Sequence, residues 1–554
     1  MIKLSPAEGT KTASNYLRGP IADDLTTEAP EFSKGSIGLI KFHGIYQQDD
    51  RDVRKAGKAF SCMVRVSVPG GQVTADQYLA LDALADPCGD GSLRITSRQG
   101  VQYHYVGKRN LKHLISSLNR AGLNTWAACG DVVRNVISAA EPVGGRPDIT
   151  SYVKLLGSKL KPRTEAYAEI WMDGEKACSF EADAAAAGGD AVEPLYGATY
   201  LPRKFKIGFA YPGENTTDLY SNDLGFVPHF ERGELKGFTL LAGGGMGQSN
   251  GVKLSHPRMA SEIAFIDEPD LLDAAKAVVG IHRDFGNREN RKIARLKYVL
   301  DDRGVDWFRA ELNLRMGKVL AVPPALTWTR YSDYLGWHEQ SAGKMFFGLR
   351  VINGRIKGPV RAAIREIVTT LRTPVRFTVQ QNLLFTDVAL ADQAKLEQIL
   401  RAHGVPLPGE LPPVLRHSMA CPALPTCGQA LTESERMAPD LIGKIEAELA
   451  AAGLGGEVVH LRSTGCPNGC ARPYTAEIGI VGQSINLYSI YLGGSPLATR
   501  LNRLYSHNIK HEEIAAQLRP LFDEWARERQ PAEAFGDFWF RKHGAEHLEA
   551  GQHA

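Results

Sequence analysis

Apolar and polar residues alternate along residues 62–68, a pattern that predicts a β-strand with one buried face. The Pro-Gly-Gly turn at 69–71 ends this strand, and residues 75–85 have the spacing of a helix. A second strand-like run covers residues 94–105. The helix that follows has an apolar face made of Leu111, Leu114, Ile115 and Leu118. The order strand, helix, strand, helix predicts one half of a ferredoxin-like unit.

The same pattern returns 282 residues later, where residues 94–123 align without a gap on residues 376–405. Arg94 matches Arg376, Thr96 matches Thr378, and Gln99 matches Gln381. Upstream, residues 64–73 resemble residues 349–356. The ungapped register favours duplication over chance similarity. We therefore expect an α+β fold with duplicated ferredoxin-like half-domains, pseudo-twofold symmetry and a site in the cleft at that axis.

Four of the eight cysteines fall in residues 421–470, as the pairs Cys421-x5-Cys427 and Cys466-Pro-Asn-Gly-Cys470. Between the pairs, apolar residues at helical spacing over 441–449 predict a helix that stops at Gly453, and residues 457–462 predict a short strand. Four gathered thiolates are typical of an iron–sulfur cluster or a structural zinc.

Zinc ribbons use shorter loops than these, and nothing in the sequence indicates the oxidising compartment that two disulfides require. Incidental core cysteines are a further alternative. A [4Fe–4S] cluster is the favoured interpretation, with Gly465 and Gly469 allowing the backbone to come close to it.

Cationic side chains interrupt several apolar runs. Arg65 and Arg134 each lie within such a run, and Lys204 and Lys206 share a face of one predicted strand. Arg94, Thr96, Arg98 and Gln102 share a face if their strand is regular. Burying an unpaired cation costs several kcal/mol, so these residues predict either an anionic ligand or paired carboxylates.

Composition limits the function classes. The 554 residues carry a net charge of only +3, which gives no argument for a nucleic-acid partner. There is no apolar signal core and no run of about 18 apolar residues, so we expect a soluble cytoplasmic protein without a membrane partner. The glycine run at 243–247 lacks the full dinucleotide fingerprint, and no Walker sequence occurs. The sequence therefore shows no binding unit for NADPH or flavin.

Taken together, these sequences resemble the sirohaem-dependent sulfite and nitrite reductases, most closely the haemoprotein subunit of the assimilatory sulfite reductases. The resemblance rests on the cysteine pairs, residues 42–52, Arg94 to Gln99, Arg134-Asn-Val, and Leu201-Pro-Arg-Lys204-Phe-Lys206, and it covers almost the whole chain. It implies two further α/β domains that bind sirohaem and the cluster.

The resemblance also implies residue roles. The cluster ligands would be Cys421, Cys427, Cys466 and Cys470, with Cys470 shared with the sirohaem iron. Substrate contacts would be Arg65, Arg134, Lys204 and Lys206. Sirohaem contacts would be Arg94, Arg98, Gln102, Gln48, Arg295 and Asn468. Arg295 stands where the family has a lysine.

The implied reaction is the six-electron reduction of sulfite to sulfide, with a diflavin NADPH reductase subunit or ferredoxin as electron donor. Reduction of nitrite to ammonia is the alternative; related nitrite reductases tend to carry asparagine at the position of Lys206, so lysine favours sulfite. A non-catalytic iron–sulfur electron carrier and a zinc-stabilised interaction protein are the alternatives of other classes.

We expect four parts of the chain: an extended N-terminal arm and cofactor loop (1–61), the half-domains (62–127 with 341–407), a central sirohaem and substrate domain (128–340), and a C-terminal cluster domain (408–554). The polar residues 43–52 have the composition of a surface loop.

Overall fold

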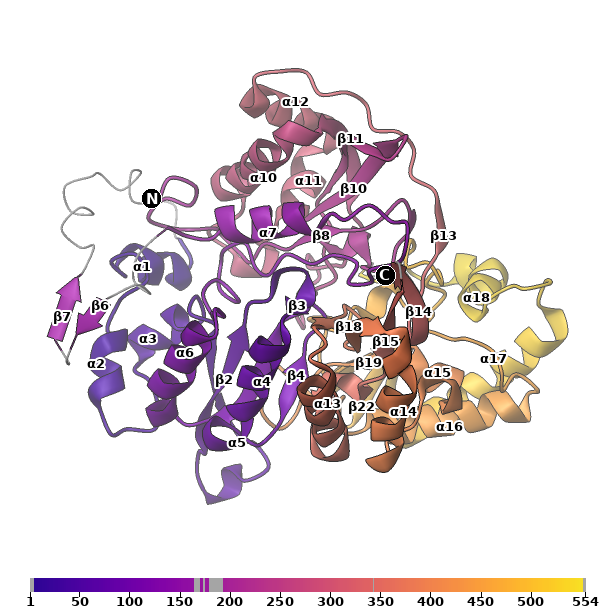
Figure 1. Ribbon diagram of the computed structural model, residues 1–554. Coiled ribbons are helices and arrows are strands. Elements are labelled where there is room, and N and C mark those ends of the chain that lie inside the picture. The colour runs from indigo at the N-terminus through magenta and orange to yellow at the C-terminus, as the bar shows by residue number, and fades with distance from the viewer. Residues whose placement is uncertain (1–3, 164–169, 173–174, 179–192, 342, 552–554) are drawn as a thin grey trace.

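The computed structural model describes residues 4–163, 170–172, 175–178, 193–341 and 343–551. Two five-stranded sheets form the centre of the fold (Figure 1). The first has the order β1 (Ile45–Asp49), β2 (Phe60–Val66), β5 (Val101–Val106), β4 (Leu93–Ile95) and β16 (Arg355–Ile356). The second has the order β14 (Gly336–Ser341), β15 (Lys344–Leu349), β18 (Leu383–Ala389), β17 (Val375–Phe377) and β3 (Gln72–Val73).

Each half donates its short strand to the sheet of the other half. β16 pairs with β4 through Arg355 and Arg94, and β3 pairs with β17 through Val73 and Val375. The covering helices are α4 (Ala75–Ala83), α5 (Ala85–Cys88), α6 (Leu111–Arg120), α13 (Gly358–Leu371) and α14 (Gln393–Ala402). One continuous apolar core contains side chains of both halves. The prediction of a duplicated ferredoxin-like pair is confirmed.

Residues 94–105 do not form the single strand that we expected. β4 ends at Ile95, a tight turn follows, and Thr96 N–H donates to Gly100 O (2.8 Å). Gln99 takes a positive φ of 58° in this turn. Arg94, Thr96, Arg98 and Gln102 therefore do not share a strand face. The second half repeats the turn, with Gln381 at φ 67°.

Three other local predictions were wrong. Residues 45–49 are a strand, because their backbone completes the open edge of β2. The N-terminal arm is not extended but contains α1 (Pro6–Thr12), α2 (Ile21–Thr26) and α3 (Lys34–Leu39). The strand expected at 457–462 is β20 (Leu461–Thr464), set by pairing with its neighbours. The sheets also extend beyond the expected ranges, since β1 and β14 complete them.

The central part contains a four-stranded sheet, β12 (Ser261–Asp267), β11 (Glu234–Ala242), β10 (Leu224–Glu231) and β8 (Ile207–Phe209). Around its core lie α7 (Thr150–Lys159), α10 (Leu271–Phe285), α11 (Leu296–Arg303) and α12 (Val305–Met316), at the top of Figure 1. Smaller elements of this part are β6 (Ile170–Met172), β7 (Glu175–Cys178), β9 (Gly213–Glu214) and β13 (Trp328–Arg330).

The C-terminal part is built on a five-stranded sheet. Its strands are β19 (Ser418–Ala420), β20 (Leu461–Thr464), β21 (Ile478–Ser484), β22 (Leu487–Leu492) and β23 (Arg503–Lys510). Its helices are α15 (Pro413–Arg416), α16 (Ala438–Ala451), α17 (Ile514–Glu528) and α18 (Phe535–His543). The predicted helix between the cysteine pairs is confirmed as α16. Across the described ranges, no helix combines the length and apolar character needed to cross a bilayer.

Candidate active site

The two cysteine pairs meet because they follow adjacent parallel strands. β19 and β20 pair in parallel, with Ala420 beside Ser463. Cys421 follows β19 directly, and Cys466 comes two residues after β20. The carboxyl ends of neighbouring parallel strands lie at the same sheet edge. This topology gathers the thiols that the sequence separates.

Each of the three inner thiols accepts hydrogen bonds from nearby N–H groups. Gly465 N–H donates to Cys421 Sγ (3.3 Å), and Asn468 Nδ2 donates to Cys466 Sγ (3.5 Å). The backbone N–H groups of Gln429 and Ala430 stabilise the Cys427 thiolate. Such donors are typical of cluster sulfurs. Asn468, expected at the sirohaem, therefore lies against Cys466, a predicted cluster ligand.

The four thiols also act on one another. Burial raises the pKa of Cys421 far above its ordinary range, and the charges of Cys470 and Cys466 add to this effect. Burial and Cys470 together raise the pKa of Cys466 to about 12. Mutual repulsion of this kind is relieved when the thiolates bind a cationic centre. The donor set therefore fits an iron–sulfur cluster, the group that this segment was predicted to hold.

The described thiols are free in Cys62, Cys88, Cys129, Cys421, Cys427, Cys466 and Cys470. Where side chains are described, no three His, Cys, Asp or Glu residues lie close enough together to hold one metal ion. The structure gives Gly465 and Gly469 a packing reason of their own, and their expected close approach to the cluster stays a prediction. A Cβ on Gly465 would lie 2.5 Å from Thr432 O, and Gly469 takes φ 63° beside Met246 O. Packing of the protein itself requires both.

The tip of the β1–β2 hairpin closes over the first cysteine pair. Arg51 donates from Nη1 to Ala430 O (2.9 Å) and from Nη2 to Cys427 O (2.5 Å). Beside it, the Gln48 amide oxygen is buried without a hydrogen-bond partner among the described residues. An orphaned acceptor at this place fits a ligand that donates a hydrogen bond.

A group of cations faces the same region, and we call it the cationic cluster: Arg65, Arg98, Arg134, Arg203, Lys204 and Lys206. The two lysines flank Phe205, whose ring is buried in the central core, so both lie on the opposite side of the extended chain. Within the described part of the chain, neither ammonium group has a hydrogen-bond or ion-pair partner. This pairing of lysines on one face was predicted.

The lysines titrate far from their usual range. Burial, with the charges of Arg134 and Arg203, lowers the pKa of Lys204 to about 7, although the charge of Cys470 partly opposes this change. Burial and the charge of Lys204 also lower the pKa of Lys206 strongly. A lysine that titrates near neutral pH can donate and regain protons. Because the charge of Cys470 acts on Lys204, the cysteine segment and the cationic cluster lie next to each other.

Arg65 and Arg134 both interact with Tyr46 and Cys129, two residues that the sequence analysis did not identify as part of the site. Arg65 Nη1 donates to the Cys129 thiol (3.0 Å), and its guanidinium lies 6.0 Å from the centre of the Tyr46 ring. Burial lowers the pKa of Arg134, but the charges of Tyr46, Cys129 and Asp131 outweigh burial and leave that pKa raised. Cys129 reads as an ordinary core thiol in the sequence, so nothing there signalled its contact with Arg65.

The other predicted sirohaem contacts fall into two sets. Arg98 lies with the predicted substrate residues: Nη2 donates to Asn135 O (2.7 Å) and Ile207 O (2.9 Å). With the Gln102 amide turned so that both of its polar atoms are satisfied, its oxygen accepts from Arg65 Nη2 (2.7 Å). Arg94 and Arg295, by contrast, are in buried ion pairs with Glu435 and Asp223. The predicted cofactor roles of all four residues stay predictions.

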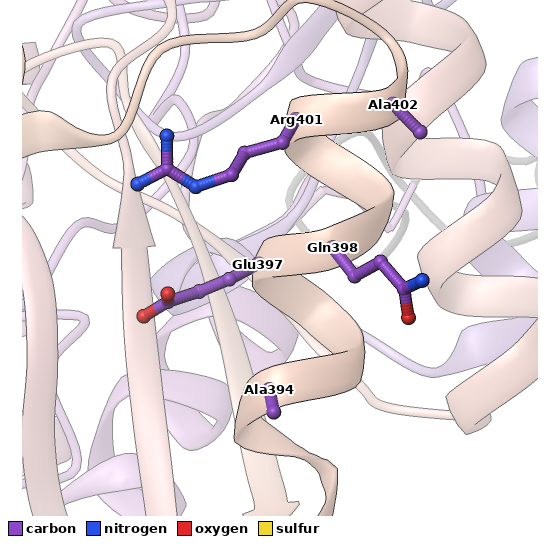
Figure 2. Close-up of a pocket in the computed structure, with 5 residues that line it drawn as sticks. All are labelled: Ala394, Glu397, Gln398, Arg401 and Ala402. Atoms are coloured by element: carbon purple, nitrogen blue, oxygen red, sulfur yellow. The ribbon is translucent and has the colours of Figure 1, made fainter.

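A shallow pocket on α14 is separate from this site (Figure 2). Figure 2 shows Glu397 and Arg401 pointing to the same side of the helix, with Gln398 on another side. Glu397 accepts from Trp337 Nε1 (2.8 Å) and Arg401 pairs with Glu410 (2.9 Å). None of the predicted site residues lines this pocket.

Two family models match the chain. The one described as nitrite/sulfite reductase ferredoxin-like half domain matches residues 54–121 and 338–403, which contain most strands of the two half-domain sheets. The one described as nitrite and sulphite reductase 4Fe-4S domain matches residues 153–320. That range includes Lys204 and Lys206 but not the four cysteines.

Full-length relatives agree. A "Sulfite reductase [ferredoxin]" of Synechococcus elongatus is 43% identical over 97% of this chain and 89% of its own length. A "Sulfite reductase [NADPH] hemoprotein beta-component" of Shewanella piezotolerans is 43% identical over 97% and 96%. The solved structure of the Mycobacterium tuberculosis NirA protein has the same fold, with a TM-score of 0.80, 23% identity, and coverage of 97% and 96%. The chain belongs to the nitrite and sulfite reductase family.

Proposed function

We propose that this protein is the haemoprotein of an assimilatory sulfite reductase and reduces sulfite to sulfide with six electrons. The observation that carries the proposal is that the charges of Cys470 and of Arg134 both act on Lys204, next to which they therefore lie. When bound, a [4Fe–4S] cluster on the four cysteines and a sirohaem ligated by Cys470 would supply the electrons and the iron that binds sulfite.

The side chains have separate tasks in the balanced reaction, SO3²⁻ + 7 H⁺ + 6 e⁻ → HS⁻ + 3 H2O. Arg65 and Arg134 hold the sulfite oxygens through forked N–H donors. Lys204, with a pKa of about 7, donates a proton to a departing oxygen and regains it at neutral pH. The Lys206 ammonium stabilises the anionic substrate.

Nitrite is the second candidate substrate, and Lys206 is the residue that favours sulfite. Its cationic side chain suits a dianion better than the smaller monoanion. A Lys206→Asn variant should lower the ratio of sulfite to nitrite turnover by about tenfold, the effect of about 1.4 kcal/mol. An unchanged ratio would remove this argument.

The electron donor is a separate protein in this proposal, either ferredoxin or a diflavin NADPH reductase. Relatives with both kinds of name match the chain equally well, so similarity does not choose between them. Binding of purified ferredoxin or diflavin reductase, followed by donor-dependent turnover, distinguishes the two. The cytoplasmic location stays a prediction.

The first experiment is an absorption spectrum of the purified protein with iron and zinc analysis, followed by viologen-driven turnover of sulfite. We expect tetrapyrrole and cluster absorbance, iron without zinc, and sulfide as product. Cluster absorbance alone would indicate an electron carrier, and zinc without colour an interaction protein. Either result would overturn the proposal.

A further inference from the structure

Asp223 is a fully buried carboxylate at the edge of the cationic cluster. Its Oδ2 accepts a hydrogen bond from the backbone N–H of Lys206 (2.9 Å) and another from Arg295 Nη2 (2.6 Å). Its Oδ1 accepts from Arg295 Nε (3.2 Å). One carboxylate therefore joins the main chain of a predicted substrate lysine to a guanidinium predicted to contact the sirohaem.

The backbone around Asp223 fixes this arrangement. Asp223 directly precedes β10, which runs parallel to β8, and Leu224 N–H donates to Lys206 O (3.0 Å). The Asp223 carbonyl accepts from Gly243 N–H (2.9 Å). The side chain and the next peptide thus hold both sides of Lys206. The residue before, Asn222, accepts from Arg98 Nη1 (2.8 Å), so a second member of the cationic cluster is fixed by the same turn.

Charge gives Asp223 a second effect. The cations that act on Lys206 are Lys204, Arg295 and Arg98, and Asp223 is the carboxylate that opposes them. Burial and neighbouring cations favour the neutral amine of Lys206, because each raises the free energy of its ammonium form. A buried anion next to the main chain of Lys206 favours the charged form. The chain holds this anion in place by a two-point contact with Arg295.

We propose that Asp223 is a positioning residue for sulfite reduction, which holds the main chain of Lys206 in the cationic cluster and places a carboxylate against the cations that surround its side chain. The proposal rests on the proposed function, in which the Lys206 ammonium stabilises the anionic substrate. Asp223 itself is fully buried and touches Lys206 only through the backbone, so it acts through Lys206.

The test compares two substitutions of opposite sign with a matched control. Asp223→Asn keeps an oxygen that can accept a hydrogen bond and removes the charge. Arg295→Gln keeps the carboxylate and removes a cation. The control is Asp82→Asn, because Asp82 is an equally buried carboxylate that pairs with Arg361 Nε (2.6 Å) in the first half-domain. All three variants break a buried ion pair, so loss of stability alone should affect them similarly.

Two measurements separate positioning from stability. Acetic anhydride labelling of Lys206 against pH, read by peptide mass spectrometry on the full-length protein, reports the ionisation of this side chain. We expect labelling about tenfold faster at pH 7 in Asp223→Asn and about tenfold slower in Arg295→Gln, as for a pKa change of about one unit. The pH at which viologen-driven turnover falls on the alkaline side of its profile should be lower in Asp223→Asn than in the parent. The Asp82→Asn profiles should match those of the parent.

Each outcome decides one claim. Opposite labelling shifts in the two variants, with turnover following, support the role of Asp223. Labelling that coincides with the parent in both variants overturns it, whatever their thermal stability. If Asp223→Asn does not fold, Arg295→Gln is compared with the parent alone. Slower labelling of Lys206 supports the proposal, and labelling that coincides with the parent overturns it. A parent protein that produces no sulfide removes the proposed function, and that result is read from the parent, independently of the labelling.

Discussion

Residues 138–142 and 418–422 occupy matching places in the two halves of the molecule, yet one contains a buried carboxyl and the other a predicted cluster ligand. The segments read Ser-Ala-Ala-Glu141-Pro and Ser-Met-Ala-Cys421-Pro. Arg376 Nη1 donates to Ala140 O (3.1 Å), and its counterpart Arg94 donates from Nη2 to the matching Ala420 O (2.8 Å). The backbone pattern is shared, whereas the chemistry is not.

The side chains around the two segments explain this difference. Arg98 of the first turn reaches the chain that contains Lys206, while its counterpart Gln380 donates to Thr216 O (2.5 Å). Burial and the charge of Glu214 raise the pKa of Glu141 to about 7, and the buried Oε2 of Glu141 has no hydrogen-bond partner among the described residues. The two segments thus share their backbone surroundings. Among the described residues, the thiols and the cationic cluster gather near residues 418–422, and Glu141 lies in the other segment.

The largest expected effect comes from removing the Cys421 thiol, which distinguishes residues 418–422 from residues 138–142. In Cys421→Ser, loss of a cluster ligand should abolish cluster absorbance and lower sulfite turnover by at least about 1,000-fold, because the cofactor supplies the redox step. Iron analysis and viologen assays measure both. The matched variant Glu141→Gln should retain its iron; retained iron and turnover in Cys421→Ser would contradict the cluster assignment.

The next effect concerns Lys204, which lies on the cysteine side. Lys204→Met should lower kcat by about 100-fold or more, the usual contribution of a proton donor. A pKa of about 7 means that the ammonium form exists below pH 7, so turnover of the parent should fall as the pH rises through about 7. Lys204→Arg should lose this alkaline fall. A parent profile that is flat from pH 6 to 8 would count against Lys204 as the donor.

A smaller effect is expected when the first turn is given the residue of the second. Arg98→Gln removes the hydrogen bonds to Asn135 O and Ile207 O, so the chain near Lys206 should lose rigidity. We expect a decrease in kcat/KM of about tenfold, from loss of charged hydrogen bonds of about 1.5 kcal/mol. The reciprocal variant Gln380→Arg should leave sulfite kinetics unchanged. Equal losses in both variants would mean that the turns do not differ in function.

The smallest effect concerns stability and Glu141 alone. A carboxyl whose folded pKa is raised from 4.5 to about 7 binds more protons in the folded state, so stability falls as the pH rises from about 4.5 to 7. The loss amounts to roughly 3 kcal/mol. Glu141→Gln should therefore raise the melting temperature at pH 8 more than at pH 5, without changing turnover. An equal change at both pH values would place the ionisation elsewhere.

Local patterns predicted a large part of this molecule. The ungapped repeat at 94–123 and 376–405 was enough to predict the paired half-domains, because strand and helix periods are properties of neighbouring residues. The cysteine spacing predicted the cluster segment in the same way. The turn at 96–100 was missed because a single chain of polar residues does not distinguish a long strand from a hairpin. Tyr46 and Cys129 were missed because their partners, Arg65 and Arg134, lie elsewhere in the chain.

The sequence by itself determined the inventory: four cysteines in two pairs, a duplicated fold, and cations within apolar strands. Only the tertiary structure decided which cations have partners. Arg94 pairs with Glu435 at a separation of 341 residues, and Arg295 pairs with Asp223 at a separation of 72. Among the described residues, neither the Lys204 nor the Lys206 ammonium group has an ion-pair partner; the charge of Cys470 acts on the first and that of Asp223 on the second. Ion pairing and desolvation depend on distances through space, and those distances exist only after β8, β10 and β20 have taken their places.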